Sequence, residues 1–279
     1  MQLDTDEEIF VSGDRQAVLE LLTMVIKGRH EWRPQTKAAF RAYQFAEEHV
    51  PHYKDFVEKA MLASVDRSPL VPAQRRVCVD DLRAVVDDLA RSAVLIVEDE
   101  INEGWFIRAL AGAFADDRII TALDNTWLVL AHAGGKDRMH RFVAARREQF
   151  TIVVRVAALL DSDQTKRSHR TRNHTYVRWI KEIDGVTEVH MWTGREMENY
   201  VPFRLWEECH PHAVDRVDAM RVMSLEERLY LDVKAHIGGG IKSDAIPPHI
   251  VLSEDDFHGL GAEVVVELRE LLAMIHRIL

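Results

Sequence analysis

The chain has 279 residues, enough for one large domain or two smaller ones. Its composition is 47% hydrophobic and 29% charged, which favours a packed core over disorder. The formal net charge of −10 argues against a protein that coats nucleic acid through bulk electrostatics, but a local basic cluster remains compatible with an enzyme acting on it.

The sequence contains neither an apolar stretch of about 18 residues nor a signal-peptide pattern at its acidic N-terminus. We therefore expect a cytoplasmic protein without a membrane span. The two cysteines, Cys78 and Cys209, lie far apart in the sequence, which fits plain thiols in a reducing compartment.

The first part of the chain, residues 1–92, has the pattern of a helical module. Apolar residues recur at helical spacing over about residues 14–65, and residues 79–91 form a further amphipathic helix pattern. Two prolines in residues 68–72 predict a linker between these segments. We expect residues 1–92 to form a packing or partner-binding module.

From residue 93 onward, predicted strands and helices alternate. The predicted strands are residues 93–97, 118–123, 126–131, 150–160 and 186–191. The predicted intervening helices are residues 102–114, 137–148 and 173–183. Such alternation predicts an α/β fold with a mostly parallel sheet and helices on both faces. We assign this core to residues 93–203, and we expect residues 204–279 to be a helical extension that packs on it.

Acidic residues follow two of the apolar strands. Glu98 comes directly after residues 93–97, and Asp161 and Asp163 come directly after residues 150–160. Open α/β sheets build their sites at the carboxyl ends of strands, and side chains two residues apart in a strand share one face. These oxygen ligands favour Mg²⁺ or Mn²⁺, and the leading chemistry is phosphodiester hydrolysis or phosphoryl transfer. Solvated acids at exposed strand ends are the alternative.

Basic residues lie close to these acids in the sequence. We predict that they contact a phosphate backbone, and they are Lys166, Arg167, Arg170 and Arg172. The segment Gly134-Gly135-Lys136 is a second candidate for phosphate contact. A solvated loop and a tight turn are the respective alternatives.

Four segments occur in an order that resembles the TOPRIM domain, particularly the form found in OLD-family nucleases and related phage-defence effectors. They are Val97-Glu98, Gly134-Gly135-Lys136, Leu160-Asp161-Ser162-Asp163 and residues 192–200. The resemblance covers about residues 94–203. Its most specific part is the Arg-Glu-x-Glu-Asn-Tyr sequence of residues 195–200, which is similar to the Arg-Glu-Ile-Glu-Asn-Tyr-Leu element of that family.

The resemblance implies a metal-dependent nuclease that cleaves DNA or RNA. It implies that Glu98 acts as a general acid/base or metal ligand, and that Asp161 and Asp163 bind the metal. Glu196 matches an acid that either supports the metal or caps a helix. Lys234 loosely resembles a downstream lysine that contacts phosphate, with an exposed helix lysine as the alternative.

Two positions depart from the family pattern. Asp99 stands where these domains usually have glycine, and Asn102 stands where many members carry another acid. The missing acid weakens the case for a fully occupied second metal, and the number of metals, one or two, stays open. Residues 1–92 show no Walker A motif, so we expect control by a separate ATPase or sensor protein in an anti-phage system, and we leave homo-oligomerisation open.

Two other functions fit some of the same residues. Residues 94–100 resemble the opening of a response-regulator receiver domain, in which Glu98 and Asp99 would hold Mg²⁺ beside a phosphoacceptor at Asp161 or Asp163. The separation of more than 60 residues is long for a receiver, and the element at residues 195–200 would remain unexplained. The second alternative is a degenerate TOPRIM fold that only binds a partner.

Overall fold

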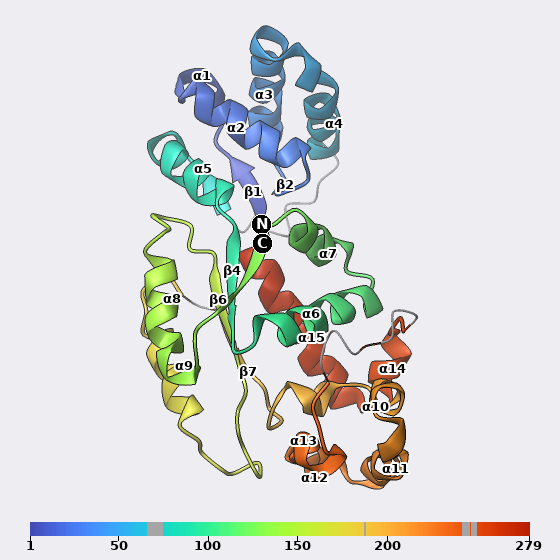
Figure 1. Ribbon diagram of the computed structural model, residues 1–279. Coiled ribbons are helices and arrows are strands. Elements are labelled where there is room, and N and C mark those ends of the chain that lie inside the picture. Colours follow the sequence, from blue (N-terminus) through green and yellow to red (C-terminus); the bar gives the residue numbers. More distant parts are fainter. Residues whose placement is uncertain (66–74, 187, 242–245, 247–249) are drawn as a thin grey trace. The chain divides into compact units, whose positions relative to one another are not determined.

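The computed structural model describes residues 1–65, 75–186, 188–241, 246 and 250–279 (Figure 1). The predicted linker at residues 68–72 lies outside the described residues. The chain forms two compact units, one of residues 1–92 with 150–154 and 279, the other of residues 93–149 with 155–278. Each unit contains its own parallel sheet, so the predicted α/β class is confirmed.

The first unit is not purely helical, and this part of the prediction is wrong. It contains a three-stranded parallel sheet in the order β2-β1-β3. The strands are two to four residues long, too short to show an alternating pattern in the sequence. Its elements are β1 (Gln2–Thr5), α1 (Ile9–Ser12), α2 (Arg15–Ile26), β2 (Glu31–Trp32), α3 (Thr36–His49), a 3₁₀ turn (Pro51–Tyr53), α4 (Lys54–Val65), β3 (Arg75–Val77), a 3₁₀ turn (Val79–Asp81) and α5 (Leu82–Ala90).

A buried carboxylate holds residues 150–154 within this first unit. Asp88, on α5, has only 1% of its surface exposed. Its oxygens accept hydrogen bonds from the backbone N–H groups of Thr151, Ile152 and Val153, at 2.6–3.1 Å. These donors belong to a segment without regular secondary structure, so the carboxylate supplies the partners that a sheet or helix would otherwise provide.

The second unit contains a four-stranded parallel sheet in the order β5-β4-β6-β7. Its strands are β4 (Ala93–Val97), β5 (Leu128–His132), β6 (Val156–Leu160) and β7 (Glu188–Met191). Every residue of β4 and β6 is buried, whereas β5 and β7 at the edges are only partly buried. This explains why the two central strands have continuously apolar sequences, as expected for strands covered on both faces.

Helices cover both faces of this sheet, as the sequence predicts. Helices α8 (Met139–Arg147) and α9 (Asn173–Lys181) lie side by side on one face (Figure 1). Helices α6 (Glu100–Ala113), α7 (Asp117–Asp124) and α15 (Ala262–Ile278) pack on the other. The remaining elements are 3₁₀ turns at Lys136–Arg138, Met197–Tyr200 and Pro211–Ala213, and helices α10 (Phe203–Cys209), α11 (Val214–Val222), α12 (Leu225–Leu229), α13 (Val233–Ile237) and α14 (Glu254–His258).

Two predicted strands need correction. Residues 118–123 are not a strand but belong to helix α7, where Asp116 caps the first turn and Ile119 and Ala122 form a buried face at helical spacing. The strand predicted over residues 150–160 begins only at Val156. The fully buried Arg155 precedes it and donates from Nε to the carbonyl of Ile278 at 2.8 Å, which places a cation at the C-terminus of α15.

Among the residues described, no helix combines the length and the apolar character needed to cross a membrane.

Replacing Asp88 with alanine should destabilise the first unit by about 3 kcal/mol, because three backbone donors lose a charged acceptor. The neighbouring Asp87 is exposed and forms a surface ion pair with Arg83, so Asp87→Ala should cost less than about 1 kcal/mol. Urea denaturation of both variants measures the difference. Equal effects of the two substitutions would contradict the role assigned to Asp88.

Candidate functional site

Acidic residues meet at the carboxyl ends of the two central strands of the second unit. From β4 the chain crosses to β5 on one side, and from β5 it crosses back to β6 on the other. The loops after β4 and β6 therefore diverge, which creates the crevice where open α/β sheets bind ligands. Glu98 follows β4 and Asp161 follows β6, and each side chain is 17% exposed.

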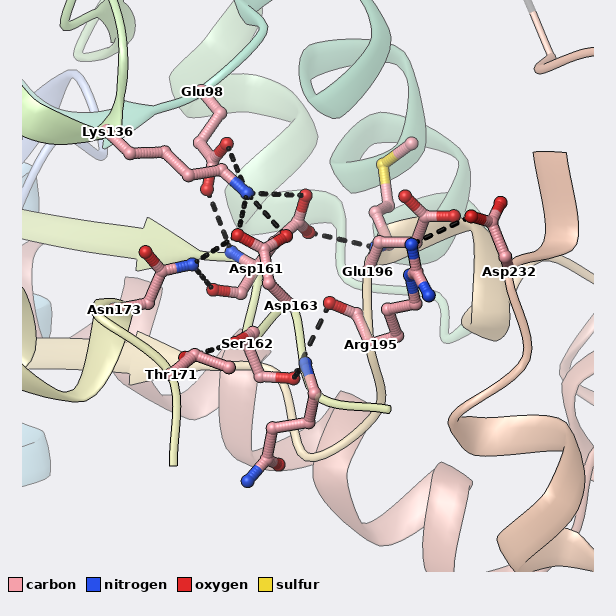
Figure 2. A network of polar contacts seen from close by, with 12 residues as sticks. Glu98, Lys136, Asp161, Ser162, Asp163, Thr171, Asn173, Arg195, Glu196 and Asp232 are labelled. Atoms are coloured by element: carbon pink, nitrogen blue, oxygen red, sulfur yellow. Dashed lines mark hydrogen bonds and ion pairs between the residues drawn. The ribbon is translucent and has the colours of Figure 1, made fainter. Parts of the chain in front are cut away.

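Figure 2 shows three carboxylates gathered around one lysine. The Nζ atom of Lys136 lies 3.2 Å from Glu98 Oε2, 3.9 Å from Asp161 Oδ2 and 2.7 Å from Asp163 Oδ1. The backbone N–H of Asp161 also donates to Glu98 Oε1 at 3.1 Å. The structure thus brings together the three predicted catalytic acids, and it adds Lys136 as the cation among them.

The backbone around Asp163 directs its carboxylate to this cluster. Strand β6 ends at Leu160, and Asp163 adopts a left-handed conformation with φ of 53°, which aspartate tolerates better than most residues. Its N–H donates to the Arg195 carbonyl at 2.9 Å. Asn173 Nδ2 donates to both the Asp161 carbonyl and Asp163 Oδ2 at 2.9 Å. The two aspartates therefore converge through a turn, not through the strand alternation that we predicted.

The electrostatics of the cluster favour a cation. Burial, together with the negative charge of Glu98, raises the pKa of Asp161 to about 8 despite the opposing charge of Lys136. Burial likewise raises the pKa of Glu98. A raised carboxyl pKa means that the charged form is poorly compensated, so added positive charge would be favourable here.

Sequence reasoning missed a further acid, Glu103. It lies on the first turns of α6, is only 4% exposed, and accepts a hydrogen bond from the Asp99 N–H at 2.6 Å through Oε2. Its Oε1 atom is buried without a hydrogen-bond partner, and burial raises its pKa well above the ordinary value. The signal was present, because Glu103 interrupts the apolar face that Phe106 and Ile107 form on the same helix.

A cavity of about 380 Å³ extends from Glu98, Asp161 and Glu103 to Glu198 and Lys234. Its polar lining consists of Glu98, Asp99, Asn102, Glu103, Asp161, Glu198 and Lys234. The Nζ atom of Lys234 lies 3.0 Å from both Glu196 Oε2 and Glu198 Oε1. Glu198 therefore lines the cavity, whereas the predicted Glu196 is joined to it through Lys234.

The segment from Arg195 to Tyr200 is a hydrogen-bonded scaffold. Asn199 accepts from the Glu196 N–H at 2.9 Å and donates to the carbonyls of Arg228 and Leu231 at 2.8 and 3.0 Å. Arg195 donates to Asp232 at 2.7 Å. Each polar side chain of this segment thus has a partner, which explains why its sequence is so distinctive.

This scaffold is tied directly to the acidic turn. The Met197 N–H donates to Asp161 Oδ1 at 3.1 Å, and the Ser162 hydroxyl donates to the Gly194 carbonyl at 2.5 Å. Gly194 is closely surrounded, since a Cβ there would lie 3.1 Å from both the Leu229 carbonyl and the Tyr200 ring. The acids after β6 are therefore held by the chain that follows β7.

A partly buried glutamate on α15, Glu267, anchors the other side of the scaffold. Glu267 accepts from the Thr193 N–H at 2.7 Å and from the Tyr200 hydroxyl at 2.6 Å, and His190 Nε2 lies 3.4 Å away. The Tyr200 hydroxyl in turn accepts from the Gly194 N–H at 2.7 Å. Burial opposes ionisation of Glu267, but these contacts together lower its pKa.

The predicted basic residues occupy the loop between β6 and α9. Those with exposed side chains are Lys166, Arg167, Arg170 and Arg172. Arg172 lies 3.7 Å from Asp137 and packs over the Tyr176 ring. The other two predicted phosphate-binding residues, Lys136 and Lys234, are already paired with carboxylates.

The carboxylate oxygens of Glu98, Asp161 and Asp163 are ligands that suit a hard divalent cation. Among the described residues, no group of three or more histidines, cysteines, aspartates or glutamates has metal-binding geometry. Lys136 contacts the three acids instead, and Oε1 of Glu103 is buried without a partner. The excess of carboxylates and this unpartnered oxygen are what Mg²⁺ or Mn²⁺ would compensate.

Comparison with protein-family models, with curated proteins and with solved structures finds no match for this chain. The functional argument therefore rests on the residues and geometry of the site.

Replacing Glu267 with glutamine should lower the free energy of unfolding by about 2 kcal/mol at pH 7. Because the folded-state pKa lies below the ordinary 4.5, the carboxylate stabilises the fold above that pH and ceases to do so as the pH falls through the lowered pKa. The difference between wild type and variant should therefore shrink in denaturation curves below pH 4.5. Glu270→Gln, exposed on the same helix, is the matched control, and a pH-independent difference for Glu267→Gln would contradict this assignment.

Proposed function

We propose that the protein is a metal-dependent nuclease that cleaves phosphodiester bonds of DNA or RNA. The observation that carries the proposal is the convergence of Glu98, Asp161 and Asp163 at the crevice between β4 and β6. Partly buried acids with raised pKa values, such as Glu98 and Asp161 at this crevice, are typical of functional sites.

Glu98 and Asp161 are the residues that would hold the cation, with Glu103 and Glu198 lining the same cavity. When bound, Mg²⁺ or Mn²⁺ supplies positive charge for a phosphoryl oxygen and lowers the pKa of a bound water. Asn102 also lines the cavity, but it donates to Asp99 Oδ2 at 2.7 Å and so belongs to the cap of α6. We infer that Glu103, which lines the same cavity, takes the role of the acid that many TOPRIM domains carry at the position of Asn102.

Two lysines provide the positive charge for the substrate. Lys136 stands among the acids on one side, and Lys234 lines the cavity between Glu196 and Glu198 on the other. Their ammonium groups are oriented by carboxylates, so little rearrangement would be needed to present them to a phosphate. A substrate phosphate could take the place of one of the carboxylates that now pair with Lys136 or Lys234, because it carries negative charge as they do.

The order of the motifs, which resembles the TOPRIM domain of OLD-family nucleases, supports a role as a phage-defence effector. Regulation by a separate ATPase or sensor protein follows from the same analogy. The receiver alternative shares the strand order and the acids after β4 and β6. Incubation with a small phosphodonor separates the two, since an acid-labile phosphoryl adduct on Asp161 or Asp163 would favour the receiver.

Replacing Glu98 or Asp161 with alanine should reduce cleavage of plasmid DNA or RNA in Mn²⁺ by about 100-fold or more, because each removes an oxygen from the proposed cation site. Cleavage is followed by gel electrophoresis of both substrates. Glu100→Ala is the control, since Glu100 is exposed two residues after Glu98. Activity that survives both substitutions would refute the site, and absence of cleavage by the wild type would favour a protein that only binds a partner.

Replacing Glu103 with glutamine should raise the Mn²⁺ concentration needed for half-maximal cleavage by about tenfold. Glutamine has the same shape and keeps an oxygen for the Asp99 N–H, so the fold should be preserved. A Mn²⁺ titration of the cleavage rate measures this. An unchanged Mn²⁺ requirement would show that the unpartnered Oε1 has no part in binding the cation.

A further inference from the structure

The basic residues of this acidic chain are concentrated beside the proposed site. Residues 136–147 and 166–181 contain eleven lysines and arginines and one acid, Asp137, although the whole chain has a net charge of −10. Those with exposed side chains are Arg138, Arg141, Lys166, Arg167, Arg170, Arg172, Arg178 and Lys181. They belong to α8, to α9 and to the segments that precede these two helices. A polyanion would be attracted to this face and not to the protein as a whole.

An aromatic platform lies in the middle of these charges. Trp179, on α9, has 38% of its surface exposed. Its ring lies 4.9 Å from that of His140, on α8, and 5.7 Å from that of Tyr176. His140 and Tyr176 are nearly parallel, with 6° between their ring planes. An exposed indole supported by two further rings is well suited to stack with a flat ligand.

Helix α9 and the 3₁₀ turn that precedes α8 also provide residues to the acidic site. Helix α9 begins at Asn173, whose amide donates to the Asp161 carbonyl and to Asp163. The Tyr176 hydroxyl donates to Asp137, which directly follows Lys136 in the chain. A ligand bound along α8 and α9 would therefore lead to the acids and Lys136.

Positive charge and an exposed aromatic platform together favour single-stranded nucleic acid. Arginine and lysine attract phosphates in any nucleic acid, but only an unpaired base can stack on an aromatic side chain. A duplex would present its phosphates while its bases remained stacked on each other. An acidic peptide would match the charge but would leave Trp179 without a planar partner.

The geometry points to a single-stranded nucleic-acid-binding surface on α8 and α9, in which a base stacks on the exposed ring of Trp179 while Arg172 and the basic residues before it contact the phosphates. This inference rests on the proposed nuclease function, because it assigns the form of the substrate. A single strand bound along α8 and α9 would extend past Asn173 and Lys136, which contact the acids of the proposed site.

Binding can be measured without cleavage by fluorescence anisotropy of labelled 12-nucleotide single strands of DNA and RNA and of the matching duplexes, in EDTA. Wild type should bind the single strands at least tenfold more tightly than the duplexes. Trp179→Ala should weaken single-strand binding about tenfold, whereas Trp179→Phe, which keeps a ring, should remain within about threefold of wild type. Circular dichroism of both variants confirms that the fold is retained.

The double variant Arg170→Glu with Arg172→Glu should bind more weakly and should reduce the slope of log affinity against log salt by about 1.4. Arg15→Glu with Lys59→Glu, on exposed positions of α2 and α4, is the matched charge control, and Phe40→Ala, an exposed ring on α3, is the aromatic control. Neither control should change binding.

Three results would overturn the inference: equal binding of duplex and single strand, unchanged binding by Trp179→Ala, or displacement of the oligonucleotide by polyglutamate of equal charge. The outcome is separable from the nuclease proposal. Single-strand binding that depends on Trp179, with no cleavage by wild type in Mn²⁺, would support this surface and refute the proposed activity.

Discussion

The second unit depends on holding like charges together at one end of a buried parallel sheet. Glu98 and Asp161 follow adjacent central strands, so their proximity follows from the pairing of β4 with β6. Repulsion and burial oppose this arrangement, as the raised pKa of each carboxyl shows. Lys136 compensates part of the charge, and its position after β5 means that three strand ends contribute to one cluster. Such an arrangement is costly for stability alone, which is why we assign it a function.

The rest of the unit keeps these acids in place. The turn after β6 is bonded to the segment after β7 through Ser162 and Met197. That segment is bonded to α15 through Tyr200 and Glu267, and the end of α15 is bonded back to the residue before β6 by Arg155. The C-terminal helix is therefore linked to the site through a closed series of polar contacts. Residues without any chemical role thus determine where the carboxylates lie.

The central strands could be predicted because strands buried on both faces are continuously apolar, as β4 and β6 are. The convergence of Glu98 with Asp161 followed from that prediction and from the general rule for open α/β sheets. The strands of the first unit could not be predicted, since they are too short to show periodicity. Glu103 was missed because an acid on an apolar helix face is recognised only once its burial is known, and the left-handed turn at Asp163 is set by contacts with residues distant in sequence.

The central claim is that the carboxylates at the ends of β4 and β6 bind a divalent cation. Isothermal titration of Mn²⁺ into the wild type and into the double variant Glu98→Gln with Asp161→Asn tests it most directly. Amides of the same shape keep the packing but remove the negative charge, so the difference reports on the carboxylates themselves. Saturable binding to the wild type that the double variant loses is the predicted result. Undiminished binding to the double variant, or no binding to the wild type, would contradict the account.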